Sequence, residues 1–357
     1  MSTDLFSKVK LGPYELQNKV VMAPMTRSRA VGNIVGELVA KYYQQRSSAG
    51  LIITEGVSPS PNGLGYARIP GLYNQAQVEG WKQVTSAVHA GGAKIFVQLM
   101  HTGRVGHQLN LPSGAKILAP SAVAAPGEMW TDQDGQKPHP TPNEMTEADI
   151  LTAIQEYAQS SKLAIQAGFD GVELHGANGY LIDQFLNTAS NQRTDKWDGN
   201  IENRIRFAVE VAKAAVAAIG ADKVGMRVSP YGAFNGMQPD GQMEELYAAL
   251  AKELNDLNLA YIHVVDHSSM GAPTVSASVK SKIRDLFKGK YILSGGYETA
   301  AAANADLAAL KGDLVAFGRP FIANPDLVEK LKTGKALNPP DFNTFYTPGE
   351  KGYTDYK

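Results

Sequence analysis

Short apolar runs recur along the chain, each bounded by Gly, Pro or polar turn residues. Between them, apolar residues repeat with helical spacing, as in the segment that contains Ile150, Ile154 and Tyr157. Strand–helix alternation repeated eight times predicts a (β/α)₈ TIM barrel, an α/β fold with its functional groups at the carboxyl ends of the strands. The eight predicted strands are Lys19–Ala23, Leu51–Glu55, Lys94–Leu99, Gly171–Leu174, Lys223–Val228, Ala260–Val265, Tyr291–Leu293 and Leu314–Phe317.

An open, doubly wound sheet is the alternative fold. That fold would place a glycine-rich fingerprint after its first strand, but here the first strand runs into Ala23-Pro24-Met25-Thr26. Thr146-Glu147-Ala148-Asp149 resembles a capping box and predicts a helix start. The pattern therefore favours the barrel.

We expect residues 1–357 to form a single domain with three additions to the barrel. Val9–Asn18, centred on Gly12-Pro13, predicts a hairpin that plugs the bottom of the barrel. The longest irregular stretch, from about His101 to Asn143, predicts a functional insertion over the barrel mouth. The Pro-, Tyr- and Gly-rich tail Leu337–Lys357 is expected to pack across the surface.

The amino-acid composition excludes several classes of function. With 34 basic and 35 acidic residues the net charge is −1, which gives no support for nucleic-acid binding. The chain has no cysteine, which excludes disulfides, thiolate metal sites, iron–sulfur clusters and a cysteine nucleophile. Met1–Lys8 contains no apolar signal-peptide core, and no run reaches the length of a membrane span. We therefore expect a cytoplasmic protein without a membrane partner.

Glycines follow the last two predicted strands. Gly295 and Gly296 follow the seventh, and Gly318 with Arg319 follows the eighth. Glycines in these two loops expose backbone N–H groups, and this is the usual phosphate site of the fold. Tight turns alone would also explain the glycines, but the arginine favours a phosphate.

Two further polar residues lie at or within strands. Arg227 lies in an apolar strand, where an unpaired guanidinium is costly, so it requires an anion, a polar ligand edge, or an ion pair to Glu173 or Asp266. Gln98, at the end of the third strand, suits the edge of a heteroaromatic ring but could equally brace a loop.

Histidines gather near the predicted barrel mouth, which makes a metal-dependent TIM-barrel hydrolase a competing interpretation. The first strand supplies no metal ligand, and the histidines lack an obvious carboxylate-bridged partner set, so we predict no metal. The histidines concerned are His101, His175, His263 and His267.

The loop after the fourth strand carries the most informative chemistry. His175, Asn178 and Tyr180 follow an apolar strand closely and are interleaved with glycines. An imidazole and a carboxamide can hold an oxygen that gains negative charge, and a phenol can deliver a proton. These groups suit reduction of an electron-poor double bond through an enolate.

Taken together, these motifs resemble the Old Yellow Enzyme family of flavin-dependent ene-reductases, bacterial members in particular. The resemblance runs from about Leu5 to Tyr356. It is carried by Val21–Arg29, Val97–Arg104, Gly171–Tyr180, Phe185–Asn187, Asn191–Asp195, Ala316–Arg319, Asn324–Leu327 and Gly352–Tyr356.

The resemblance implies a non-covalently bound FMN over the strand ends and NADPH or NADH as reductant. Thr26 would lie near the flavin O4/N5 edge, Gly56 and Gln98 at its pyrimidine edge, and Arg227 near N1 and O2. The phosphate would be held by the glycine loops and Arg319. The implied cofactor-binding residues are Pro24, Met25, Thr26, Gly56, Gln98, Arg227, Gly295, Gly296, Gly318 and Arg319.

The resemblance also implies the catalytic roles. His175 and Asn178 would bind the carbonyl or nitro oxygen of an activated alkene or nitro compound, with Tyr66 and Tyr346 as further substrate-binding residues. Tyr180 would protonate the α-carbon after hydride transfer. Enones, enals, maleimides, nitroalkenes and nitrate esters all fit. A non-catalytic phosphate- or flavin-binding barrel is the alternative from another class.

Two positions depart from the bacterial pattern. Several relatives carry His at the position of Asn178 and Trp at that of Met100. Both Asn and His donate hydrogen bonds, so activity is expected to survive while substrate preference shifts. Thr26, in place of a cysteine, assigns the chain to the classical branch of the family.

Overall fold

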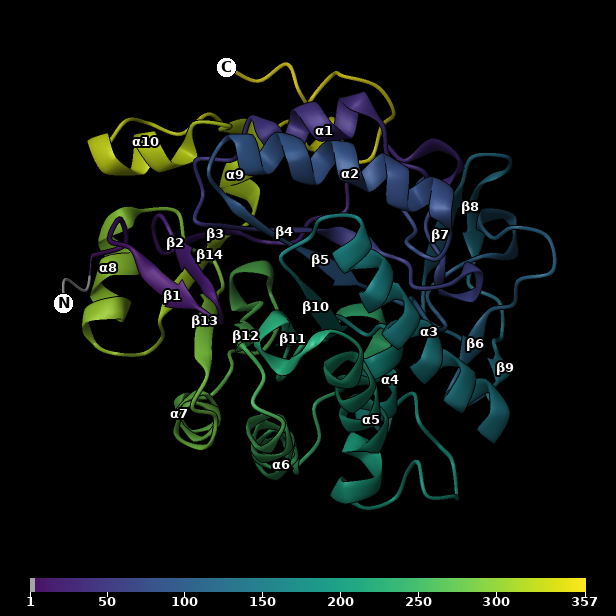
Figure 1. The fold of residues 1–357 in the computed structure, drawn as a ribbon. Helices are drawn as coiled ribbons and strands as arrows, with labels where there is room; N and C mark the ends of the chain where they lie inside the picture. Colours follow the sequence, from purple (N-terminus) through teal and green to yellow (C-terminus); the bar gives the residue numbers. More distant parts are fainter. Residues whose placement is uncertain (1–3) are drawn as a thin grey trace.

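The protein folds around a closed barrel of eight parallel strands, seen in a computed structural model that describes residues 4–357 (Figure 1). Met1–Thr3, part of the stretch without a signal-peptide pattern, lie outside the described residues. The predicted (β/α)₈ barrel is confirmed. Its strands are β3 (Val20–Met22), β4 (Leu51–Val57), β5 (Lys94–Leu99), β10 (Gly171–Gly176), β11 (Val224–Val228), β12 (Tyr261–Val265), β13 (Lys290–Ser294) and β14 (Leu314–Phe317).

Helices surround this barrel, and their apolar faces form the larger core against the outside of the strands. At the start of α3 the predicted capping box is confirmed, with Thr146 accepting from the backbone of Asp149 and Asp149 accepting from that of Thr146. No helix within residues 4–357 is both long and apolar enough to cross a membrane. The helices are α1 (Glu37–Gln44), α2 (Gln75–Ala90), α3 (Glu147–Gln166), α4 (Leu181–Leu186), α5 (Ile201–Ile219), α6 (Met243–Asp256), α7 (Ala277–Leu286), α8 (Ala300–Ala308), α9 (Arg319–Ala323) and α10 (Leu327–Thr333).

The predicted amino-terminal hairpin consists of β1 (Val9–Leu11) and β2 (Tyr14–Leu16), paired antiparallel. Leu11 and Leu16 are fully buried in a second core with barrel residues such as Val21. This second core lies at the amino-terminal ends of the strands, so the hairpin closes the bottom of the barrel. The site can therefore open at the other end alone.

The segment after β5 contains more regular structure than its sequence suggests. β7 (Glu128–Thr131) and β8 (Gly135–Pro138) form a hairpin, and β6 (Leu118–Ala119) pairs with β9 (Asn143–Glu144). Figure 1 shows these short strands at one side of the barrel. β7 buries only alternate residues and β8 buries none fully, so these strands contribute few apolar side chains to a core. The hydrophobic pattern of the sequence therefore does not reveal them.

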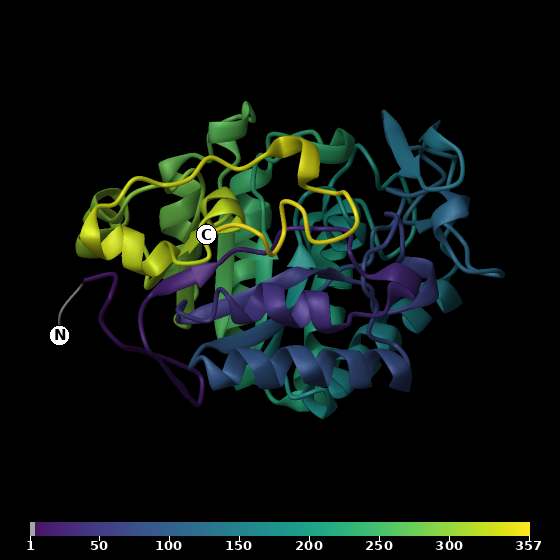
Figure 2. The ribbon, with the colours of Figure 1, turned by 90° about the horizontal axis from the view of Figure 1, so that it is seen from above.

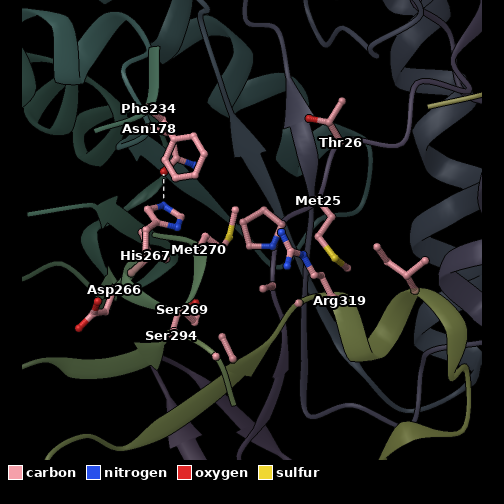
Figure 3. Close-up of a pocket in the computed structure, with 18 of the residues that line it drawn as sticks. Met25, Thr26, Asn178, Phe234, Asp266, His267, Ser269, Met270, Ser294 and Arg319 are labelled. Atoms are coloured by element: carbon pink, nitrogen blue, oxygen red, sulfur yellow. Dashed lines mark hydrogen bonds between the residues drawn. The ribbon is translucent and has the colours of Figure 1, made fainter. Parts of the chain in front are cut away.

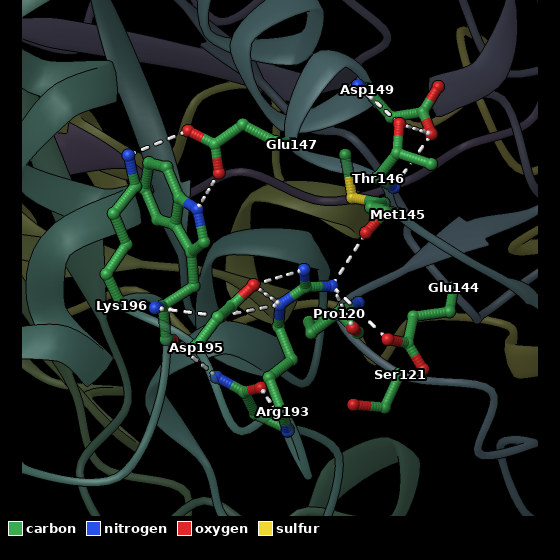
Figure 4. Close-up of polar contacts among 12 residues, drawn as sticks. Pro120, Ser121, Glu144, Met145, Thr146, Glu147, Asp149, Arg193, Asp195 and Lys196 are labelled. Carbon is green, nitrogen blue, oxygen red and sulfur yellow. Dashed lines mark hydrogen bonds and ion pairs between the residues drawn. The ribbon is translucent and has the colours of Figure 1, made fainter.

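Arg193 ties this segment to the loop before α5 (Figure 4). Its guanidinium donates to the backbone oxygens of Pro120 (2.8 Å) and Met145 (2.6 Å). It also pairs with Asp195 at 2.6 Å, and Asp195 in turn accepts from the backbone of Trp197. One side chain thus fixes two long connections relative to each other.

The carboxy-terminal tail crosses back over the barrel toward α1, as the yellow trace in Figure 2 shows. Arg29 holds it through the backbone oxygens of Thr344 (2.8 Å), Phe345 (2.7 Å), Gly349 (3.3 Å) and Lys351 (3.0 Å). A guanidinium has five N–H donors in a fixed plane, so it can satisfy several carbonyls of an irregular segment at once. The predicted surface tail is therefore anchored by a buried side chain.

We predict that Arg29→Met destabilises the protein by about 2–4 kcal/mol, since it leaves several tail carbonyls without donors. Amide hydrogen exchange across residues 342–356 should accelerate more than exchange in the barrel strands. The control is Lys335→Met, an exposed position after α10, for which neither quantity should change. Unaltered exchange in the tail of Arg29→Met would show that other contacts hold it.

Candidate active site

A cavity of about 630 Å³ opens at the carboxyl ends of the barrel strands, as barrel geometry requires (Figure 3). It is lined by the loops after most strands and by the carboxy-terminal tail. Among its lining residues are these predicted site residues: Pro24, Met25, Thr26, Tyr66, Asn178, Tyr180, Arg227, Gly295, Gly296, Gly318, Arg319 and Tyr346.

Three predicted site residues do not line the cavity. Gly56 lies inside β4, which continues to Val57, at an irregularity in the pairing with β5. A Cβ there would approach Met100 Sδ to 2.4 Å, so a side chain at this position would require Met100 to move. Gln98 lies inside β5, where its Nε2 donates to Glu173 Oε1 at 2.8 Å. Their cofactor contacts stay predictions.

His175 is the third of these residues. It is buried near the end of β10, with its ring centroid 5.1 Å from that of Tyr180. Burial, and then the charge of Arg227, hold the pKa of His175 well below its usual value. Its Nδ1 has no hydrogen-bond partner within the described part of the chain. A neutral imidazole with a free ring nitrogen is thus available beside the phenol.

The loop after β10 is held in an unusual conformation. Asn178 and Gly179 both have positive φ, at 62° and 76°. The backbone N–H of Asn178 donates to Ser229 Oγ at 2.9 Å, and that of Gly179 donates to Asp183 Oδ2 at 2.8 Å. These bonds fix a conformation that non-glycine residues seldom adopt. The loop can therefore present Asn178 and Tyr180 in fixed positions.

Tyr180 carries a neutral phenol in this environment. Burial first, and then the neighbouring Tyr66, raise the pKa of Tyr180 well above its usual value. The two hydroxyls lie 2.9 Å apart. Val105, Ala125 and Met129 pack behind both rings, so the segment after β5 supports the cavity wall. No described residue of the 101–143 stretch itself lines the cavity, and its place as an insertion over the mouth stays a prediction.

Arg227 brings an unpaired positive charge to the cavity. The candidate ion-pair partners are used elsewhere, because Glu173 accepts from neutral donors and Asp266 pairs with Lys280 at 2.6 Å. Burial lowers the pKa of Arg227, while Glu173 opposes that shift through its charge. The Nε of Arg227 has no partner among residues 4–357. A buried, unpaired guanidinium fits an anionic or strongly polar ligand edge.

The glycines after β13 and β14 and Arg319 also line the cavity. Gly295 and Gly296 have φ values of 149° and 70°, and a Cβ at Gly295 would lie 2.6 Å from the backbone oxygen of Asp266. Side chains are thus excluded there, and the backbone is open to a ligand. Arg319 begins α9 beside Gly318, with its guanidinium 5.6 Å from the ring centroid of Phe342. These groups fit a phosphate.

The histidines at the barrel mouth do not converge. His263 Nδ1 bonds to Glu173 at 2.8 Å, His267 Nε2 bonds to Asn178 at 2.6 Å, and His101 Nδ1 accepts from Gly103. No group of three potential metal ligands occurs among the described residues. The metal-dependent hydrolase interpretation thus finds no support in this arrangement.

A model of the NADH:flavin oxidoreductase / NADH oxidase family matches residues 4–338. The chain belongs to this family. An old yellow enzyme homologue from Zymomonas mobilis has a TM-score of 0.95 at 38% identity, covering 99% of both chains. The resemblance to Old Yellow Enzymes, noted in the sequence, is therefore confirmed.

Two further members of the family are similar over nearly the whole chain. A probable flavin mononucleotide-dependent alkene reductase of Leishmania infantum is 41% identical, over 99% of this chain and 98% of its own. Morphinone reductase in complex with tetrahydroNAD has a TM-score of 0.94 at 43% identity, covering 99% of this chain and 97% of that one. The predicted flavin-dependent class is thereby confirmed.

The structure adds residues that the sequence did not single out. Phe234 and Asn235, from the loop after β11, line the cavity with Phe345 of the tail. Asp183 supports the loop after β10 from the first turn of α4. The sequence does contain a signal for this contact, since Asp183 follows Gly179 by four residues. A carboxylate in the first turn of a helix can accept a hydrogen bond from a backbone N–H of the preceding loop.

We predict an unusual pH dependence from Asp183. Burial raises its pKa to about 7, so the folded state binds this proton more tightly than the unfolded state does. Relative to Asp183→Asn, wild-type stability should fall as pH rises from about 4 to about 7, by at most about 4 kcal/mol, and then stay level. Urea unfolding at about pH 4.5, 6 and 8 measures the difference.

Asp195→Asn is the control. Arg193 lowers the pKa of Asp195, so wild-type stability relative to this variant should fall only as pH drops below about 4 and should be nearly level across the three pH values. If the difference between wild type and Asp183→Asn is the same at all three pH values, the buried carboxyl does not titrate as we expect.

Proposed function

We propose that this protein reduces carbon–carbon double bonds activated by a conjugated carbonyl group, with FMN as resident cofactor and NADPH or NADH as reductant. The observation that carries the proposal is one cavity that joins the neutral phenol of Tyr180, the amide of Asn178 and the unpaired guanidinium of Arg227. Membership of a flavin oxidoreductase family supports the cofactor.

The residues divide into a cofactor set and a substrate set. Arg227 would stabilise negative charge at the pyrimidine side of the flavin, with Gln98 and Gly56 at that edge and Thr26 near O4 and N5. Pro24 and Met25 would border the ring. The phosphate would be held by Arg319 and by the backbone of Gly295, Gly296 and Gly318. When bound, FMN supplies the hydride that the nicotinamide nucleotide has delivered to it.

His175 and Asn178 donate hydrogen bonds to the oxygen of the activating group. Donation withdraws electron density from the β-carbon and stabilises the enolate oxygen. Tyr180 then donates its proton to the α-carbon, which a phenol held neutral by burial can do throughout the working pH range. Tyr66 and the exposed Tyr346 would border the substrate at the cavity rim.

Nitroalkenes and other nitro compounds are proposed as further substrates, because a nitro oxygen is also a hydrogen-bond acceptor. A cytoplasmic location stays a prediction from the sequence. The proposed partners are small molecules, without nucleic acid or membrane.

The experiment that tests this function is a bleaching cycle. The purified protein should be yellow, lose its colour with NADPH or NADH under anaerobic conditions, and regain it when cyclohexenone is added. A colourless protein that takes up no added FMN would overturn the proposal. A protein that bleaches but is re-oxidised by oxygen and by none of a panel of enones would favour a flavin-binding barrel with another activity.

We predict that Tyr180→Phe leaves cofactor reduction by NADPH nearly intact and slows the re-oxidation by cyclohexenone about 10²-fold, since the proton donor is lost. Stopped-flow absorbance separates the two half-reactions. Tyr66→Phe is the matched control, because it removes the neighbouring hydroxyl and keeps the donor. An equal loss in both half-reactions of Tyr180→Phe would indicate structural damage instead.

Replacing Arg319 and replacing Arg227 should affect the cofactor in different ways. Arg319→Ala is expected to purify partly free of FMN, to lose more FMN at high salt, and to regain activity when FMN is added. Arg227→Ala should retain more FMN but shift the flavin midpoint potential downward, because the reduced anion loses its counter-charge. The FMN dissociation constant and the flavin midpoint potential, measured for both variants, test these expectations. An unchanged potential in Arg227→Ala, with full retention in Arg319→Ala, would assign both residues a structural role.

A further inference from the structure

Asn178 uses nearly all of its hydrogen-bonding groups within the protein. Its backbone N–H donates to Ser229 Oγ at 2.9 Å, and its backbone oxygen accepts from Asn235 Nδ2 at 2.7 Å. Its side-chain oxygen lies 2.6 Å from His267 Nε2, the contact drawn in Figure 3. The described residues thus leave one polar group of Asn178 free at the cavity, the two amide protons on Nδ2.

His267 is placed for this contact by the loop after β12. The preceding residue, Asp266, donates its backbone N–H to Ser294 on β13, and the backbone oxygen of His267 accepts from Met270. Phe234 packs edge-on against the imidazole, with ring centroids 4.6 Å apart. The ring is therefore fixed both by its backbone and by a neighbouring aromatic residue.

The protonation of His267 follows from its surroundings. Burial, and then the charge of Arg227, lower its pKa to about 4, so the ring is neutral near pH 7 and carries one proton. The side-chain oxygen of an asparagine accepts hydrogen bonds but cannot donate them. A 2.6 Å contact between that oxygen and Nε2 therefore requires the proton to be on Nε2.

We propose that His267 is a positioning residue that sets the polarity of Asn178, so that the cavity offers hydrogen-bond donors, and no acceptor, at this point. A free carboxamide can rotate by half a turn and present either its oxygen or its N–H₂. In the rotated amide, the N–H₂ group would point at the Nε2–H of His267, and this part-buried hydrogen bond would be lost. The inference rests on the proposed function, since it concerns how the substrate oxygen is selected.

This arrangement makes the cavity selective by chemistry as well as by shape. Ligands whose oxygen is an acceptor alone, such as a carbonyl, a nitro group or a phenolate, match the N–H₂ of Asn178. Ligands that place an N–H or a neutral O–H donor there would bring two donors together and leave one unsatisfied. His267 would thus determine specificity without touching the reacting atoms.

The first test reads the tautomer of His267 directly. Nitrogen-15 NMR of the histidine-labelled, full-length protein near pH 7 should show Nε2 protonated and Nδ1 unprotonated, with the signal assigned by its loss in His267→Gln. The inference is overturned if Nδ1 carries the proton, because Nε2 would then accept from an Asn178 amide turned the other way. This measurement needs no turnover.

The second test measures the selectivity of the FMN-loaded protein with para-hydroxybenzaldehyde, whose phenolate is acceptor-only at its oxygen. His267→Ala should weaken binding about 10-fold in an absorbance titration, while His267→Gln, which keeps an N–H donor, should stay within about 3-fold of wild type. The double variant Asn178→Ala/His267→Ala should bind the phenolate no more weakly than Asn178→Ala alone, since both substitutions remove the same interaction. Equal affinity of His267→Ala and wild type would overturn the inference.

The outcomes distinguish this inference from the proposed function. A wild-type protein that takes up no FMN rejects the function, and the tautomer still decides whether His267 orients Asn178. A wild-type protein that completes the bleaching cycle, together with unaltered ligand binding in His267→Ala, rejects the inference alone.

Discussion

The buried carboxylate of Glu173, at the centre of the barrel, determines how the polar side chains around it are used. Its Oε1 accepts from Gln98, and its Oε2 accepts from Tyr261 at 3.1 Å and from His263 at 2.8 Å. A charge inside a barrel must be surrounded by donors, and here these donors are neutral groups. Burial opposes ionisation, yet the hydrogen bond from His263 and the charge of Arg227 hold the pKa of Glu173 below its usual value.

This use of neutral donors leaves the guanidinium of Arg227 available. Had Arg227 bonded directly to Glu173, the pair would be a structural ion pair with nothing left for a ligand. Instead the carboxylate stabilises the cation through its charge, while Nε of Arg227 has no hydrogen-bond partner in the described part of the chain. The same carboxylate fixes Gln98 by one of its amide protons. Gln98, which we propose to bind the cofactor, is thus oriented by a carboxylate that does not line the cavity.

Much of this could be predicted from the sequence, because the strongest signals are local. The barrel strands are short apolar runs with turn residues at both ends, and the loop after β10 concentrates His175, Asn178 and Tyr180 in one segment. The contact between Asn178 and His267 could not be predicted, since it joins loops after different strands and depends on the rotation of an amide. Gly56, predicted to follow the second strand, lies within β4, and the register shift in its pairing with β5 is not visible in the apolar pattern.

The tail anchored by Arg29 has a consequence for biosynthesis. Barrel closure pairs β3, near the start of the chain, with β14, and the cavity wall is completed by Phe345 and Tyr346, whose segment docks on Arg29. During translation the amino-terminal half leaves the ribosome first and must wait for these partners. The first barrel strands therefore spend most of synthesis with an unpaired edge, and the cofactor cavity can form only after nearly the whole chain has emerged.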